Sequence, residues 1–86
     1  MRLTLSAPVS VLLLSDSTNG RVTPLRLRWD GRSHAIVRVG LHHTYRRGRV
    51  LVHVYSVTTD AAFYRLELDS EALTCTLVEI SDGLPD

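Results

Sequence analysis

The residues best suited to chemistry lie at positions 42–49, in the stretch His-His-Thr-Tyr-Arg-Arg-Gly-Arg. Three arginines surround Gly48 there, and a tyrosine precedes them. Guanidinium groups bind phosphate oxygens bidentately, and a tyrosine ring offers a face on which a nucleobase can stack. A hairpin tip of this kind favours contact with a nucleic-acid backbone, but a solvated charged turn explains the same residues about as well. The candidate binding residues of this tip are Tyr45, Arg46, Arg47 and Arg49.

A second set of arginines lies on the polar side of two neighbouring predicted strands. We expect His34 between these arginines and Tyr55 on the same side. Cations for phosphates and rings for bases are the components of a platform for single-stranded nucleic acid. Internal neutralisation by the carboxylates of a later strand, at 63–69, is the alternative, because opposite charges across strands contribute about 0.2–1 kcal/mol each. The arginines concerned are Arg26, Arg28 and Arg38.

A third candidate is the hairpin tip Trp29-Asp30-Gly31-Arg32. Trp29 and Arg32 offer a stacking surface and a phosphate-binding group. Turn chemistry alone explains the Asp-Gly pair between them, however. The structural interpretation is therefore favoured, in which Trp29 closes one end of the core and Arg32 forms a salt bridge nearby.

Metal binding and catalysis find little support in the sequence. His42 and His43 point to opposite faces of a predicted strand, so only one of them can join His34 or His53 in a site, and no Cys/His spacing of a zinc site occurs. Cys75 shares one face of its predicted strand with Leu73 and Leu77, and we expect it to be a buried, unreactive thiol. We expect no metal, no cofactor and no enzymatic activity.

Apolar and polar residues alternate with a period of two through most of the chain, and this pattern must position the candidate residues. Such alternation is typical of half-buried antiparallel strands. Turn sequences rich in Asn, Asp and Gly separate the alternating segments. We predict six strands, at about residues 3–14 with an interruption near Pro8, 22–29, 33–45, 49–57, 63–69 and 73–80.

The hairpin at Asp30-Gly31 allows two registers. A three-residue connection pairs Trp29 with Ser33 and Leu27 with Ala35, and thereby keeps one face apolar. Since a shift of one residue moves every side chain to the other face, we predict this longer connection.

The predicted fold class is all-β. Strands in sequence order form a single small antiparallel meander of five to six strands, and the strand at 33–45 is long enough to bend at Gly40. Curling removes exposed edges, so we expect an SH3-like or related partly open barrel.

The chain has 86 residues, which allows one domain, residues 1–86, with a frayed tail at 81–86. Its hydrophobic fraction of 44% and charged fraction of 22% argue against intrinsic disorder. The formal charge of +1 divides unevenly, into +7 over residues 20–50 and −6 over residues 51–86. This division is the most informative feature of the composition.

A single cysteine allows no internal disulfide, which favours a reducing, cytoplasmic location. The longest apolar run, Val11–Leu14, is far shorter than the roughly 20 residues of a membrane span. We therefore expect no membrane association.

The stretch Pro24–Val37 resembles a family of small bacterial β domains of unknown function, through its pattern Pro-Leu-x-x-x-Trp-x-Gly-Arg-x-His-x-x-Val. The similarity covers about residues 22–82 and includes Tyr55-Ser56-Val57, Tyr64-Arg65-Leu66 and Asp82. Leu27 replaces a frequent aromatic residue, and the usual tryptophan of the last strand is missing. The resemblance implies a small β fold, no activity, and a loose association with bacterial DNA-repair genes.

Two functions follow as hypotheses. The first is a small nucleic-acid-binding module, for DNA or RNA, that uses backbone charge and stacking and is linked to DNA repair. The alternative is a protein-interaction or self-assembly module, in which the basic half, 20–50, of one copy meets the acidic half, 51–86, of another or of a partner. Both hypotheses use the same charges.

Overall fold

The computed structural model describes residues 1–82, in which six strands follow one another without a helix between them. All six strands predicted from the alternating pattern are confirmed. Within the described residues, no helix has the length and apolar character that crossing a membrane requires. The strands are β1 (Arg2–Asp16), β2 (Arg21–Trp29), β3 (Arg32–Arg47), β4 (Val50–Thr59), β5 (Phe63–Asp69) and β6 (Thr74–Ser81).

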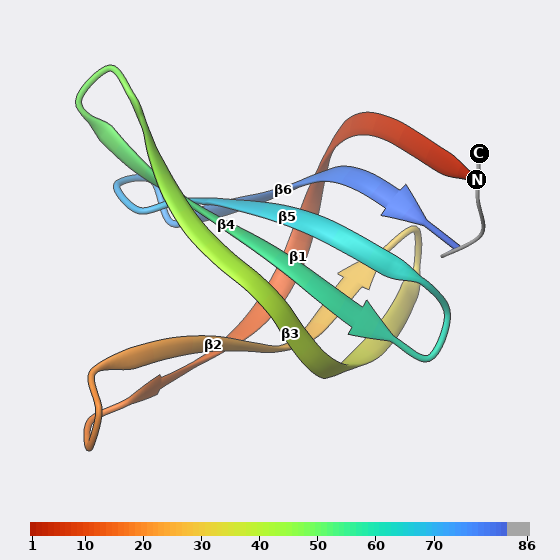
Figure 1. Cartoon of the computed structure of the whole chain (residues 1–86), viewed down its shortest axis with the longest axis horizontal. Helices are drawn as coiled ribbons and strands as arrows, with labels where there is room; N and C mark the ends of the chain where they lie inside the picture. Colours follow the sequence, from red (N-terminus) through yellow and green to blue (C-terminus); the bar gives the residue numbers. More distant parts are fainter. Residues whose placement is uncertain (83–86) are drawn as a thin grey trace.

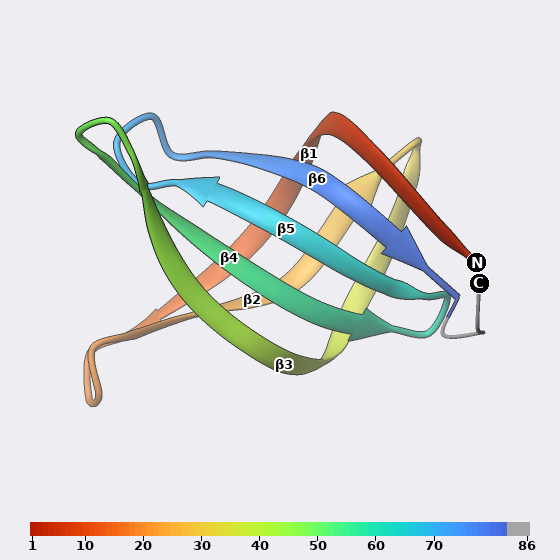
Figure 2. The ribbon, with the colours of Figure 1, turned by 45° about the horizontal axis from the view of Figure 1, so that its top comes forward.

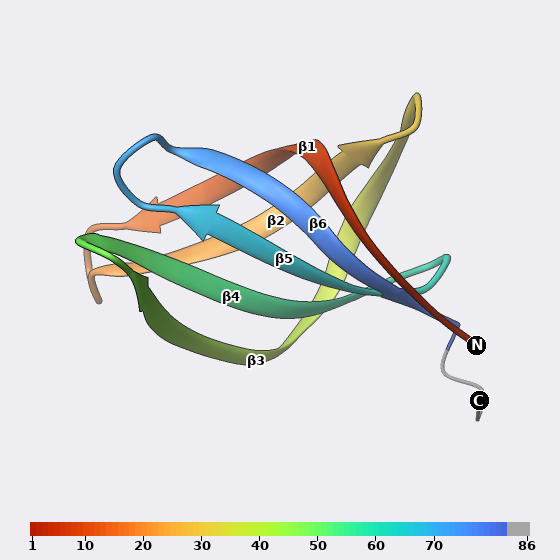
Figure 3. The same ribbon diagram turned by 90° about the horizontal axis from the view of Figure 1, so that it is seen from above.

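The strands form an antiparallel meander that closes into a barrel, because β1 pairs with β6 as well as with β2 (Figure 1). Figure 2 shows β4, β5 and β6 side by side along one wall, with β1 and β2 crossing on the other side. In Figure 3, β1 and β2 lie opposite β3 and β4. The expected all-β meander is thus confirmed.

The core is formed by alternate residues of β4 and β5, with one leucine from β2 and one from β6. Burial of a large apolar side chain stabilises a fold by about 1.5–3 kcal/mol. Trp29 is half-buried and packs against this cluster, as the structural interpretation of its hairpin requires. The buried members of the cluster are Leu27, Tyr55, Val57, Tyr64, Leu66, Leu68 and Leu77.

The predicted interruption near Pro8 is wrong, since β1 is continuous from Arg2 to Asp16. Pro8 lies opposite Thr76 of β6, and β2 joins β1 only from Ser10 onward. A proline whose nitrogen faces the side without a partner strand removes no hydrogen bond from the sheet. Proline is therefore tolerated inside this strand.

The predicted register of the β2–β3 hairpin is also wrong. Trp29 pairs with Arg32 and Leu27 with His34, across a two-residue turn. Asp30 and Gly31 both have positive φ, at 54° and 73°, as the type I′ turn that matches strand twist demands. Turn geometry therefore decides the register, and it brings a histidine onto the inner face.

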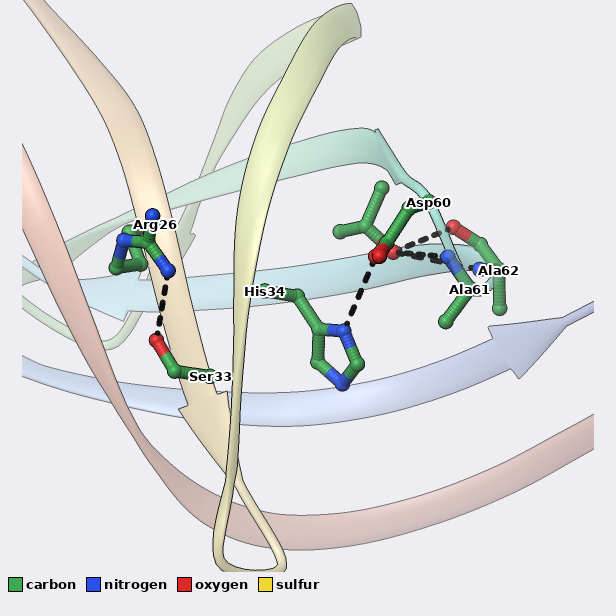
Figure 4. Close-up of polar contacts among 7 residues, drawn as sticks. Arg26, Ser33, His34, Asp60, Ala61 and Ala62 are labelled. Carbon is green, nitrogen blue, oxygen red and sulfur yellow. Dashed lines mark hydrogen bonds and ion pairs between the residues drawn. The ribbon is translucent and has the colours of Figure 1, made fainter.

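The inward His34 is accommodated by specific partners. Its Nδ1 lies 3.2 Å from a carboxylate oxygen of Asp60 in the β4–β5 turn (Figure 4), and its ring lies 6.1 Å from that of Tyr64. A buried polar group costs little when it is hydrogen-bonded. The expectation that His34 lies among the outer arginines is therefore wrong.

β3 is the longest strand and bends as predicted around Gly40. Its pairing with β4 shifts register twice, between Ile36 and Arg38 and between Val39 and Leu41. Such bulges increase the local twist of a strand. They let β3 leave β2 and continue along β4 to the tip of the β3–β4 hairpin (Figure 1).

β2 and β3 pair through four residue pairs, from Arg26–Ala35 to Trp29–Arg32. Before Arg26, β2 has only β1 as a strand partner, and beyond Ala35, β3 has only β4. We call these two unpaired edges the β2–β3 seam. The hairpin tips of β1–β2 and β3–β4, on either side of the seam, project from the same end of the barrel (Figures 1 and 3).

The expected frayed tail at 81–86 lies largely outside the described residues. Ser81 ends β6, and the amide of Asp82 donates to the carbonyl of Met1 at 3.3 Å. The remaining four positions, 83–86, are outside the part of the chain that the structure describes.

Candidate nucleic-acid interface

The arginines of residues 20–50 are largely without acidic partners. Of the eight, only Arg47 forms an ion pair with a carboxylate of residues 1–82. Arg32, for which a salt bridge was expected, forms none within these residues. Within residues 1–82, most of the basic charge of this half is therefore not neutralised by ion pairs.

The carboxylates of the acidic half have other partners. Asp60 faces His34, and Asp69 accepts two backbone amides of the turn that follows β5, both at 2.9 Å. Glu79 faces two arginines outside the basic half, Arg2 at 3.5 Å and Arg65 at 3.8 Å. Within residues 1–82, neutralisation of basic-half arginines by carboxylates of the strand at 63–69 is thus confined to one pair, Arg47 and Glu67.

That one pair joins the β3–β4 hairpin to β5. The Tyr45 hydroxyl donates to Oε1 of Glu67 at 2.8 Å, and Nη2 of Arg47 donates to both groups, at 2.9 and 3.1 Å. The hydrogen bond with Tyr45, and then the nearby Glu67, raise the pKa of Arg47. Arg47, one of the predicted binding residues of this tip, is therefore partly neutralised, and its partner Tyr45 is held in place.

The remaining tip arginines stay open to solvent. Arg46 donates only to the backbone carbonyl of Arg49, at 3.4 Å, and both side chains belong to exposed residues. Gly48 between them has a φ of +61° and forms the turn. Two cations without acidic partners thus lie at the end of a hairpin that projects from the barrel.

Arg26 and Arg28 lie together on the outer face of β2, as predicted. Nη1 of Arg26 donates to the Ser33 hydroxyl at 3.0 Å, across the β2–β3 hairpin (Figure 4). Both arginines line a shallow hollow of about 300 Å³ with Leu12 of β1. This face combines unpaired cations with exposed apolar surface.

Arg38 lies apart from that pair, on the outer side of β3 after its first bulge. It lines a different hollow, of about 280 Å³, with Phe63 and Arg65 of β5. The predicted single face of three arginines is therefore two surfaces, one on β2 and one on β3–β5.

Tyr55 is not part of either surface, and its prediction as a stacking residue is wrong. Its side chain is 3% exposed and belongs to the core. Burial raises its pKa, and its hydroxyl donates to the Val22 carbonyl at 3.2 Å. No base can stack on a ring so enclosed.

A stacked group of rings covers Tyr55 at the seam. The His42 ring lies 4.3 Å from that of Tyr55, and its Nε2 is 2.9 Å from Nδ1 of His53. Partial burial, and then the repulsion of His53 and His43, lower the pKa of His42. The sequence indicated that one of the two adjacent histidines can join His53, and the structure identifies it as His42.

Residues for metal or nucleophilic chemistry do not gather in the described part of the chain. No group of three or more His, Cys, Asp or Glu residues that could hold a metal ion occurs within residues 1–82. Cys75 is half-buried, and burial raises the pKa of its thiol, which lowers its reactivity. The arrangement favours binding through charge and surface shape.

No family model matches this chain, and no curated protein or solved structure is significantly similar to it. The resemblance drawn from residues 24–37 accordingly rests on the sequence pattern alone. Any function must be argued from the surface described above.

Two residues of that surface did not stand out in the sequence. Phe63 and Arg65 frame the hollow beside Arg38, yet neither was among the predicted binding residues. Their alternation with the buried Tyr64 and Leu66 did place them on the outer face. The sequence did not reveal the strand register that brings β5 close to Arg38.

Proposed function

We propose that this domain binds nucleic acid, chiefly through phosphate contacts. One observation carries the proposal: seven of the eight arginines of residues 20–50 have no carboxylate partner within residues 1–82. Arginine suits phosphate because its planar group donates two parallel hydrogen bonds. Clustered arginines without acidic neighbours therefore support an interaction with a polyanion.

The distribution of these arginines suits an extended ligand. Arg46 and Arg49 lie at the β3–β4 tip, and Arg21 lies where the β1–β2 tip joins β2 at the same end of the barrel (Figure 1). Arg26 and Arg28 continue the positive charge along β2. Cations at several separate positions on one molecule are typical of backbone-charge binding with weak sequence preference.

The alternative, assembly of basic and acidic halves, has less support. Its acidic surface would need free carboxylates, yet Asp60, Glu67 and Glu79 already face cationic groups or histidine. Asp69 is occupied by backbone amides. Few carboxylates of the described acidic half are left for a second copy.

Fluorescence anisotropy with labelled single- and double-stranded oligonucleotides, at a series of salt concentrations, tests the proposal. We expect the logarithm of affinity to fall linearly with the logarithm of salt, with a slope of about −0.7 per phosphate contact for single strands. The variant Arg46→Ala/Arg49→Ala should bind more weakly and with a shallower slope. The matched variant Arg46→Lys/Arg49→Lys keeps both charges and should retain most of the slope. Undetectable binding at low salt would overturn the proposal.

A further inference from the structure

A hollow on the outer face of the barrel, which shares only Arg38 with the residues predicted to bind, offers a place for a planar ligand. It has a volume of about 280 Å³ and lies across β3, β4, β5 and β6. Pockets that enclose whole small molecules have volumes of about 300–1,000 Å³. A hollow of this size suits one unit of a longer ligand. Its lining includes Arg38, Gly40, Ser56, Phe63, Arg65 and Glu79.

The hollow exists partly because Gly40 has no side chain. A Cβ atom built on Gly40 would lie 3.6 Å from the Ser56 carbonyl oxygen, an ordinary contact distance. The φ of Gly40 also lies outside the left-handed region that favours glycine. The backbone therefore accepts a larger residue here, and what glycine provides is space.

Phe63 supplies an apolar, planar surface at the hollow. It is 49% exposed, whereas the next residue, Tyr64, is buried in the core. Within residues 1–82 Phe63 has no aromatic stacking partner, and its exposed surface lies at the hollow.

The lining of the hollow carries an excess of positive charge. Arg38 has no carboxylate partner within the described residues. Glu79 is the one carboxylate in the lining, and it lies between Arg65 at 3.8 Å and Arg2 at 3.5 Å. Arginines thus outnumber carboxylates here, and the hollow is complementary to an anion that carries a flat group.

We infer that this hollow binds one nucleotide of a single-stranded nucleic acid, with its base on Phe63 and its phosphate beside Arg38 and Arg65. This inference rests on the proposed function and assigns it a substrate class. In a duplex both faces of a base are covered by its neighbours, so only an unpaired base can stack on a protein ring. The domain should therefore prefer single strands, or unpaired bases at ends and loops.

The test compares four surface variants, one of them a control, with wild-type protein, using labelled single-stranded and fully duplex oligonucleotides. Stacking on an aromatic side chain typically strengthens binding about 5–150-fold per base. We expect Phe63→Ala to weaken single-strand binding by a factor in this range and Phe63→Trp to retain it. Gly40→Leu should also weaken it, because its side chain fills the hollow. Leu73→Ala, at an exposed leucine in the β5–β6 turn, is the matched control and should bind as wild type.

The outcomes separate this inference from the proposed function. If the wild type binds with the expected salt dependence and Phe63→Ala binds equally well, the inference is overturned and the proposed function stands. Equal loss of duplex and single-strand affinity in Phe63→Ala also overturns it. If the wild type binds neither ligand at low salt, both fail. Circular dichroism checks folding, and the Phe63 pair decides the question even if Gly40→Leu does not fold.

Discussion

The hydroxyl of Tyr55 in β4 donates to the backbone carbonyl of Val22 in β2 at 3.2 Å, across the β2–β3 seam. β3 lies between these strands in the order of the sheet, but it does not pair with β2 at this position. A side chain from the core thus spans the part of the wall where backbone pairing is missing. The bond fixes the first half of β2 against the barrel.

Tyr55→Phe removes this bond and keeps the ring. We expect the free energy of unfolding to decrease by about 0.5–1.5 kcal/mol, the usual net value of such a hydrogen bond. Urea denaturation followed by circular dichroism measures it. Tyr45→Phe, which removes the hydrogen bonds of the exposed Tyr45 with Glu67 and Arg47, should cost less. Equal stabilities of wild type and Tyr55→Phe would show that the bond does not support the seam.

Stability should decrease on mild acidification because of His42. The pKa of His42 is lowered in the folded protein, so the unfolded chain takes up the proton first as the pH falls through about 6.5. Above that pH both states are neutral at this site and it contributes no pH dependence. Between about pH 7 and pH 5 the free energy of unfolding should therefore fall.

Unfolding of wild type and of His42→Asn across this pH range measures the contribution. The decline should be shallower in His42→Asn, because the variant lacks the group that titrates. His43→Asn, one residue along and on the other face of β3, should keep most of the decline. A His42→Asn protein as sensitive to acid as wild type contradicts the assignment.

The β2–β3 turn predicts a difference between two glycines. Gly31 has a φ of +73°, which L residues adopt with strain, whereas the φ of Gly40 lies outside that region and a Cβ there makes an ordinary contact. Gly31→Ala should lower the free energy of unfolding by about 1–2 kcal/mol, and Gly40→Ala should leave it nearly unchanged. Thermal unfolding of the two variants side by side checks this. Equal effects would argue against the type I′ turn.

Under the proposed function, Glu67 should compete with nucleic acid for Arg47. Glu67→Gln removes the carboxylate, frees the guanidinium of Arg47 and increases the positive charge of the β3–β4 tip. We expect a several-fold higher affinity at low salt and a steeper salt dependence, by about 0.7 for one added phosphate contact. Anisotropy titrations measure both quantities. Glu71→Gln, which changes the charge equally without releasing an arginine, should give a smaller increase.

The alternation of apolar and polar residues predicts most of the strands, but in β4 it does not show which face points into the barrel. Val52 and Val54 are buried on one face of β4, and Tyr55 and Val57 are buried on the other. An apolar strand covered on both faces has no polar residues to indicate which side is inner. The prediction that Tyr55 faces outward failed for this reason.

The burial of Val52 and Val54 on the outer face of β4 has a specific cause. Tyr45 pairs with Val52, and Glu67 pairs with Val54, so the tyrosine–glutamate bond lies on the same face as these valines. The wrong hairpin register has a different origin, because the local turn at Asp30-Gly31 overrides the apolar pattern. What the local pattern cannot contain is the partner that accommodates the inward His34, since Asp60 is 26 residues away.

The free edge of β3 has a consequence for how copies of this domain coexist. A long regular edge is a template on which the same edge of another molecule can add, and this is a common route to aggregation. Here two register shifts interrupt the edge between Ile36 and Leu41, and Arg46 lies at its end. Irregular spacing prevents continuous pairing, and like charge repels a second copy. The β2–β3 seam can thus stay free of a second copy at high concentration, and the arginines proposed to bind a polyanion also keep copies of the domain apart.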